Sequence, residues 1–167
     1  MHTGLMSTEL FCYRARAFCN LIENTSHYGH KELQHLVSAL ALLYSEANRL
    51  ILCDVDEVDD EQQPPSVKQT EREVIVNRIT AALHQEYYRV VDPLNIYESP
   101  APTMSQISDD LTDIWQELTI GLRLWDRVNA KDRRLAQWHW AFSFSSHWGL
   151  HAVNAITYMH HTLARMR

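Results

Sequence analysis

Glycine, proline and cysteine are all scarce in this chain of 167 residues, which has four glycines, five prolines and three cysteines. Few glycines and prolines mean few tight turns, so long helices are favoured over many short strands. The cysteines are odd in number, and Cys12 and Cys19 lie two turns apart on one predicted helix, too far apart for a disulfide. Because no Cys-x-x-Cys pair occurs, a zinc ribbon and a thioredoxin-like site are excluded. We therefore expect reduced thiols in a cytoplasmic protein.

Clustered positive charge and long apolar runs are also missing. The chain has 15 Lys and Arg against 21 Asp and Glu, a net charge of −6, which disfavours nucleic acid as a direct partner. No apolar stretch approaches membrane-spanning length. The N-terminus does not combine a basic region with an apolar run, so we expect no signal peptide there. We predict one helical domain over residues 1–167 that neither binds nucleic acid nor enters a membrane.

Known catalytic motifs are lacking as well. The chain contains no Gly-x-Ser-x-Gly elbow and no phosphate-cradling glycine loop. Two-metal carboxylate bundles repeat a Glu-x-x-His motif, of which only Glu32-x-x-His35 is present. Metalloproteases place a glutamate directly after the first histidine of His-x-x-x-His, where this chain has Trp148. The motifs therefore leave it open whether the protein is an enzyme.

Apolar residues recur at helical spacing in five blocks. We predict helices over about residues 7–23, 31–53, 70–91, 105–125 and 130–166. An acidic segment with two prolines, at about residues 54–69, is expected to form an exposed loop. The last helix is apolar on more than one face, which is typical of the centre of a bundle, and Gly149 favours a kink or a close helix crossing within it. The expected fold is all-α: a compact bundle of about five helices with a long central C-terminal helix.

Histidines and carboxylates on the last two predicted helices form a candidate site. His147 and His151 lie one turn apart, and Asp110, Asp113 and Glu117 share one side of the preceding helix. If these two faces meet, the resulting set of nitrogen and oxygen ligands suits a divalent transition metal such as zinc, manganese or iron. Such an ion can activate water for hydrolysis.

The stripe that carries the two histidines contains four further residues. We predict that these residues line a pocket or an internal polar network: Trp140, Phe144, Asn154 and Tyr158. A structural use of the same cluster is the more economical interpretation, because a histidine inside a bundle can fix packing by hydrogen bonding to an aspartate on a neighbouring helix. His-x-x-x-His alone is weak evidence for a metal site.

Four phrases of the sequence carry a family resemblance. They are Leu42-Leu43-Tyr44, Tyr87-Tyr88-x-x-Val91-Asp92-Pro93-Leu94, Asp109-Asp110-Leu111-x-Asp113-Ile114-Trp115 and Phe142-Ser143-Phe144-x-x-His147-Trp148-Gly149-x-His151-Ala152. Together they resemble domain-of-unknown-function family 5063 over nearly the whole chain. The resemblance implies a compact all-α fold of bacterial origin with no assigned activity. Members of that family tend to be encoded near exonuclease-like genes, so it also implies a nuclease as a candidate protein partner.

Two functions remain open at this point. The first is a non-enzymatic interaction or regulatory module that binds a protein partner through a helical face or the acidic loop. It is preferred because no catalytic pattern is complete and because acidic helical bundles without catalytic motifs are commonly adaptors. The alternative is a metal-dependent hydrolase that uses His147, His151, Asp110 and Asp113.

Overall fold

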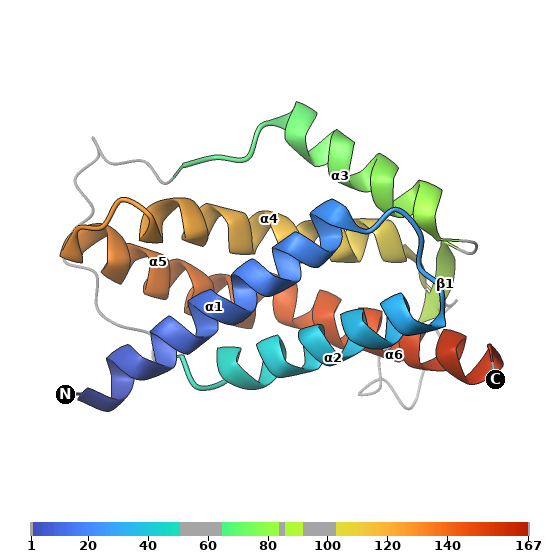
Figure 1. Ribbon diagram of the computed structural model, residues 1–167, viewed down its shortest axis with the longest axis horizontal. Coiled ribbons are helices and arrows are strands. Elements are labelled where there is room, and N and C mark those ends of the chain that lie inside the picture. Colours follow the sequence, from blue (N-terminus) through green and yellow to red (C-terminus); the bar gives the residue numbers. More distant parts are fainter. Residues whose placement is uncertain (1, 51–64, 84–85, 92–102, 167) are drawn as a thin grey trace.

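Most of the chain is helical, as the computed structural model shows for residues 2–50, 65–83, 86–91 and 103–166 (Figure 1). The elements in order are α1 (His2–Asn24), α2 (His30–Ala47), α3 (Gln69–Ala82), β1 (Tyr87–Val90), β2 (Thr103–Gln106), α4 (Ile107–Trp125), α5 (Ala130–Ser143), the π-helical turn η1 (Phe144–Trp148) and α6 (Gly149–Arg165). The last three elements follow one another without a break, and together they are called the C-terminal helix. The prediction of an all-α bundle with a long C-terminal helix is confirmed.

One hydrophobic core receives side chains from all the helices. Helix α4 packs against α1, α3, α5 and α6, while α2 packs against α1 and α6. The contact between α4 and α5 is especially close, because a Cβ atom on Gly121 would lie 2.0 Å from the Trp140 indole nitrogen. That nitrogen donates a hydrogen bond to the Leu118 carbonyl at 3.3 Å. Glycine at position 121 therefore allows a fully buried tryptophan to lie directly against the α4 backbone.

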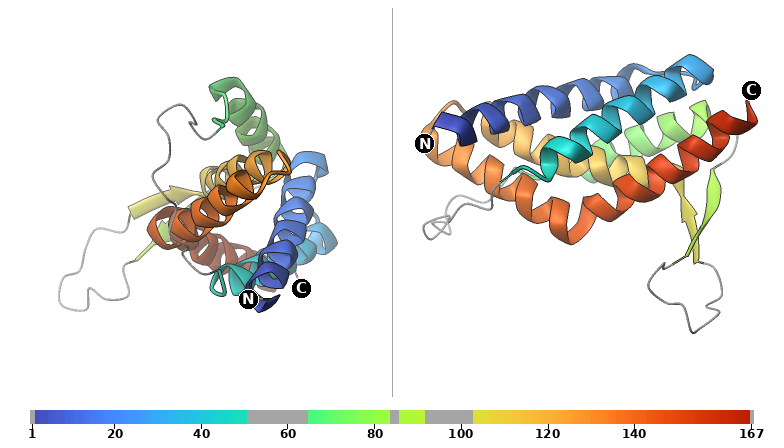
Figure 2. Two further views of the ribbon diagram at one scale, coloured as in Figure 1. Left: turned by 90° about the vertical axis from the view of Figure 1, so that its left-hand side faces the viewer. Right: turned by 90° about the horizontal axis from the view of Figure 1, so that it is seen from below.

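The C-terminal helix bends at η1, as Figure 2 shows in its right-hand view. A Cβ atom on Gly149 would lie 2.5 Å from the Phe144 carbonyl oxygen, so only glycine fits after the wide π turn. The hydroxyls of Ser145 and Ser146 donate to carbonyls of the preceding turn. Inserted π turns of this kind are frequent at functional sites. The irregularity expected near Gly149 is confirmed.

The prediction of the third helix was wrong in its last turns. Helix α3 ends at Ala82, and residues 87–90 form strand β1, which pairs antiparallel with β2. Apolar residues at 87 and 90 continue the helical spacing by coincidence, whereas burial in the strand alternates residue by residue. The fourth helix was predicted to begin at about residue 105, but Ser105 lies in β2, and α4 begins at Ile107.

The second predicted helix was also too long. Helix α2 ends at Ala47, and the amide of Asn48 donates to the Tyr44 carbonyl at the C-cap. Residues 51–53 and most of the predicted acidic loop lie outside the described residues. No helix in the described part of the chain is long and apolar enough to cross a membrane.

Candidate functional site

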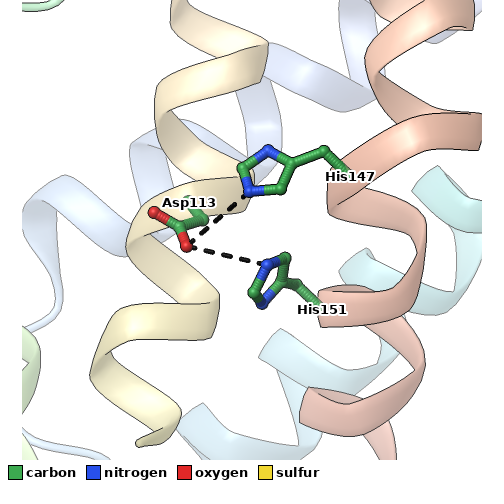
Figure 3. A group of neighbouring side chains, drawn as sticks. All are labelled: Asp113, His147 and His151. Atoms are coloured by element: carbon green, nitrogen blue, oxygen red, sulfur yellow. Dashed lines mark ion pairs between the residues drawn. The ribbon is translucent and has the colours of Figure 1, made fainter.

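Three carboxylates of α4 face three histidines of the C-terminal helix. Asp110, Asp113 and Glu117 occupy successive turns of α4, because their spacings of three and four place them on one side. Since α4 packs against α5, η1 and α6, this side meets one histidine from each of those elements: His139, His147 and His151. These six residues are called the histidine–carboxylate ladder. Figure 3 shows its middle, where Asp113 points toward His147 and His151.

The first contact of the ladder joins His151 to Asp110. The Nδ1 atom of His151 lies 2.6 Å from Asp110 Oδ1, and its Nε2 atom lies 3.7 Å from Asp113 Oδ2. The hydrogen bond to Asp110 raises the pKa of His151, and it outweighs burial, which acts in the opposite direction. The negative charges of Asp110, Asp113 and Asp109 raise that pKa further.

Glu117 holds the other two histidines. Its Oε1 lies 3.2 Å from His147 Nδ1, and its Oε2 lies 3.1 Å from His139 Nε2. Burial acts to raise the pKa of Glu117, but the hydrogen bonds and charges of His139 and His147 together hold it below the ordinary value. The remaining nitrogen of His147, Nε2, lies 4.0 Å from Asp113 Oδ2.

The hydrogen bonds at Nδ1 determine how His147 and His151 face Asp113. An ionised carboxylate only accepts hydrogen bonds, so each Nδ1 atom carries the proton. In a neutral imidazole, Nε2 then carries the lone pair. Both Nε2 atoms approach the same oxygen, Asp113 Oδ2, and one ligand atom from each of the three residues lies within 4.8 Å of the others.

Arg72 links α3 to the outer side of the ladder. Its Nη2 atom lies 2.7 Å from Asp109 Oδ1 and 2.7 Å from Asp113 Oδ1. The local charges are therefore four carboxylates, those of Asp109 and the three ladder residues, against one guanidinium. With neutral histidines, four minus one leaves three uncompensated negative charges. The negative potential of such a region attracts a cation or favours protonated histidines.

The antiparallel strands β1 and β2 form the β1–β2 hairpin, and two of its side chains complete the surroundings of Asp110. The hydroxyl of Tyr88 donates a hydrogen bond to Asp110 Oδ2, and the Ser105 hydroxyl lies 3.4 Å from the same oxygen. Burial raises the pKa of Tyr88, and the hydrogen bond to the charged Asp110 raises it further. The Tyr88 ring also packs against Tyr158, with ring centroids 5.2 Å apart.

The structure brings together five of the predicted site residues, which are Asp110, Asp113, Glu117, His147 and His151. The four residues predicted to line a pocket or polar network lie outside this group of five. Trp140 is fully buried in the core against Phe11 and Trp125, and Phe144 packs against Tyr44 and Trp148. Tyr158 is buried and contacts the ladder through Tyr88, and Asn154 is half-buried on α6.

Sequence reasoning missed His139, Arg72 and Tyr88. A signal for His139 was present, because it precedes His147 by eight residues, slightly more than two helical turns, and therefore lies on a nearby face. Arg72 and Tyr88 come from other elements, and nothing in their local sequence indicates a contact with α4.

The fold and the ladder define a class of protein: an all-helical bundle with a histidine–carboxylate cluster between α4 and the C-terminal helix. The chain belongs to the family described as Domain of unknown function (DUF5063), which it matches over residues 6–165, so the predicted resemblance is confirmed. It is also similar to the crystal structure of protein BF1032 from Bacteroides fragilis. That comparison has a TM-score of 0.77 and 21% sequence identity, covering 95% of this chain and 91% of the other. At this identity the similarity shows the fold. No curated protein gave a significant match.

Proposed function

We propose that the protein binds one divalent transition-metal ion, such as zinc, manganese or iron, through Asp113 Oδ2, His147 Nε2 and His151 Nε2. The observation that carries this proposal is the orientation of the two imidazoles. Each has its Nδ1 atom held by a carboxylate and its Nε2 atom directed at one shared oxygen. Metal-binding histidines are typically oriented in this way, with the second ring nitrogen donating to a carboxylate. A histidine–aspartate pair that only fixes packing accounts for the bond between His151 and Asp110. It does not require the Nε2 atoms of both histidines to face the same Asp113 oxygen.

The distances at Asp113 support the same proposal. The separations of 3.7 and 4.0 Å between Asp113 Oδ2 and the two Nε2 atoms are too long for good hydrogen bonds. They do not exceed twice a metal–ligand bond of about 2.0–2.2 Å. One ion placed between the atoms therefore reaches Asp113 and either histidine without pushing them apart.

The charge balance favours an ion as well. A divalent cation offsets most of the three uncompensated negative charges around the ladder. Protonation of His147 and His151 offers the same relief without a metal, and this is the competing arrangement. The two differ in what occupies the Nε2 lone pairs, so the measured metal content separates them.

Hydrolysis is the second candidate function, favoured by the small number of protein ligands. Three ligands leave coordination positions open, as in catalytic zinc sites. The side chain of His147 is 43% exposed, so water can reach the ion from its side. An ion in this setting supplies an activated water molecule when it is bound.

An interaction role with a protein partner is proposed on the composition and the family. The acidic net charge supports an interaction or regulatory module. From the cysteine content and the family resemblance we propose that it acts in the bacterial cytoplasm, with a nuclease as one candidate partner. A pull-down with the full chain tests this role. The interaction role is contradicted if the full chain recovers no protein above the level bound by resin without the chain.

Metal analysis of untagged protein tests the main proposal. We expect about one ion per chain after equilibration with zinc, manganese or iron, and loss of binding in Asp113→Asn, His147→Ala and His151→Ala. The matched control is His160→Ala, which removes an exposed histidine of α6 outside the ladder and retains binding. Circular dichroism of each variant verifies that the fold is intact. A wild-type protein that binds none of the three ions overturns the proposal.

Hydrolytic activity has its own test. The metal-loaded wild type and His147→Ala are compared on phosphate-ester and carboxylic-ester substrates. Turnover that requires both the ion and His147 supports the second candidate, whereas a metal-loaded protein without turnover on either class contradicts it.

A further inference from the structure

The β1–β2 hairpin reaches the ladder through two side chains that lie opposite each other. Tyr88 and Ser105 are direct partners in the antiparallel register, so they share one face of the hairpin. Both hydroxyls lie at Asp110 Oδ2. Tyr87, one residue away and on the other face, is 53% exposed. The hairpin therefore has one face that contacts α4 and another toward solvent, and Figure 2 shows its two strands projecting from the bundle.

Asp110 connects the hairpin face that contacts α4 to His151. The carboxylate is buried, so the protein must satisfy its two oxygens. One oxygen accepts from Tyr88, and the other accepts the Nδ1 proton of His151 at 2.6 Å. Tyr88 thus fixes the carboxylate, and the carboxylate fixes the imidazole whose Nε2 atom faces Asp113.

We infer that Tyr88 is a positioning residue for the metal ligand His151, and that ion binding and docking of the β1–β2 hairpin stabilise each other. This inference rests on the proposed metal site. Because free-energy coupling between two sites is reciprocal, an ion that orders His151 and Asp110 also holds Tyr88 in place. Conversely, any event that lifts the hairpin from α4 weakens the hold on the ion.

The base of the hairpin has separate attachments that do not involve the ladder. The Glu86 carbonyl accepts from the Ile107 amide at 3.0 Å, and the Glu86 carboxylate bonds to Ser108 and Thr80. Removal of the Tyr88 hydroxyl therefore leaves the hairpin tethered. Tyr88→Phe is consequently a test of coupling and not of folding.

The first experiment measures zinc affinity by competition with a chromogenic chelator. We expect Tyr88→Phe to bind zinc about tenfold more weakly than the wild type, the lower end of the effect typical for partners of metal-binding histidines. Ser105 remains near Asp110 in this variant and limits the loss. Tyr87→Phe is the matched control, the same change on the opposite face, and we expect its affinity to equal that of the wild type.

The outcomes separate the two proposals. A wild type that binds zinc, with Tyr88→Phe equal to Tyr87→Phe, overturns the inference and leaves the metal site intact. A wild type that binds no metal overturns both. Equal melting temperatures of the two metal-free variants would show that the loss of affinity arises from positioning and not from general destabilisation.

Hydrogen exchange tests the reciprocal effect. In the wild type, saturating zinc is expected to slow amide exchange in residues 87–90 and 103–106, which form the paired strands. In Asp113→Asn, zinc is expected to leave that exchange unchanged. Exchange in the hairpin of the wild type that does not respond to bound zinc contradicts the coupling.

Discussion

Two faces of the C-terminal helix, one residue apart in sequence, have opposite chemistry. Trp140 and Trp148 are fully buried and pack against Phe11 in the core. The residues directly before them, His139 and His147, face the carboxylates of α4. The core face is held by burial of aromatic surface, whereas the ladder face is held by charge and hydrogen bonds. The difference indicates that stability and the proposed function reside on different faces of one helix and can be separated by mutation.

Trp140→Ala is expected to have the largest effect on stability. Removing a fully buried tryptophan leaves a cavity beside Gly121 and should lower the free energy of unfolding by about 3–5 kcal/mol. Chemical denaturation checks this, with Trp138→Ala as the control for a half-buried tryptophan on the same helix. If Trp140→Ala lowers the free energy of unfolding no more than Trp138→Ala does, the distinction between the two faces is contradicted. Residual folded Trp140→Ala should still bind zinc.

Asp110→Asn tests the ladder face at its most buried residue. The amide keeps the shape of the carboxylate but loses the charge that accepts from His151 and Tyr88, so we expect a loss of about 1–3 kcal/mol in the metal-free protein. Zinc binding should weaken by a larger factor than in Tyr88→Phe, because both oxygens of the carboxylate are affected. An unchanged melting curve together with unchanged zinc affinity would show that Asp110 does not position His151.

The pH dependence of stability sharpens the comparison, because His151 lies on the ladder face, whereas Trp140 and Trp148 on the core face do not ionise. The pKa of His151 is raised in the folded protein, so its contribution to stability is fully present below the unfolded value of about 6.5 and is lost as pH rises through the folded value. The carboxylates of Asp109, Asp110 and Asp113 raise this pKa. Around them, Tyr88 donates to Asp110, Arg72 contacts Asp109 and Asp113, and the His147 ring lies beside His151.

The measurement is the melting temperature of metal-free protein from pH 6 to pH 9. We expect the wild type to lose more stability over this range than His151→Gln. Zinc affinity should change in the opposite direction and rise with pH, because protons compete for the ligand nitrogens. If the melting temperatures of the wild type and His151→Gln change equally with pH, the raised pKa of His151 is contradicted.

The comparison of the two faces also shows what the sequence could predict. Spacings of three and four residues placed Asp110, Asp113 and Glu117 on one flank, because helical geometry is local. The strand at residues 87–90 was missed, since its partner at 103–106 is distant in sequence and the apolar spacing there also fits a helix. Arg72 was missed for a similar reason: its position is set by the packing of α3 on α4.

The smallest effect is expected at the far end of the ladder, from His139→Ala. His139 touches Glu117 but not Asp113, so it acts on the proposed ion only by holding the carboxylate that orients His147. We therefore expect a loss of zinc affinity below the roughly tenfold loss predicted for Tyr88→Phe. Glu117→Gln, which removes the charge facing His147 Nδ1, should cost more than His139→Ala. If chelator competition instead shows His139→Ala to be as damaging as His147→Ala, the ion lies nearer to Glu117, and His139 is one of its ligands.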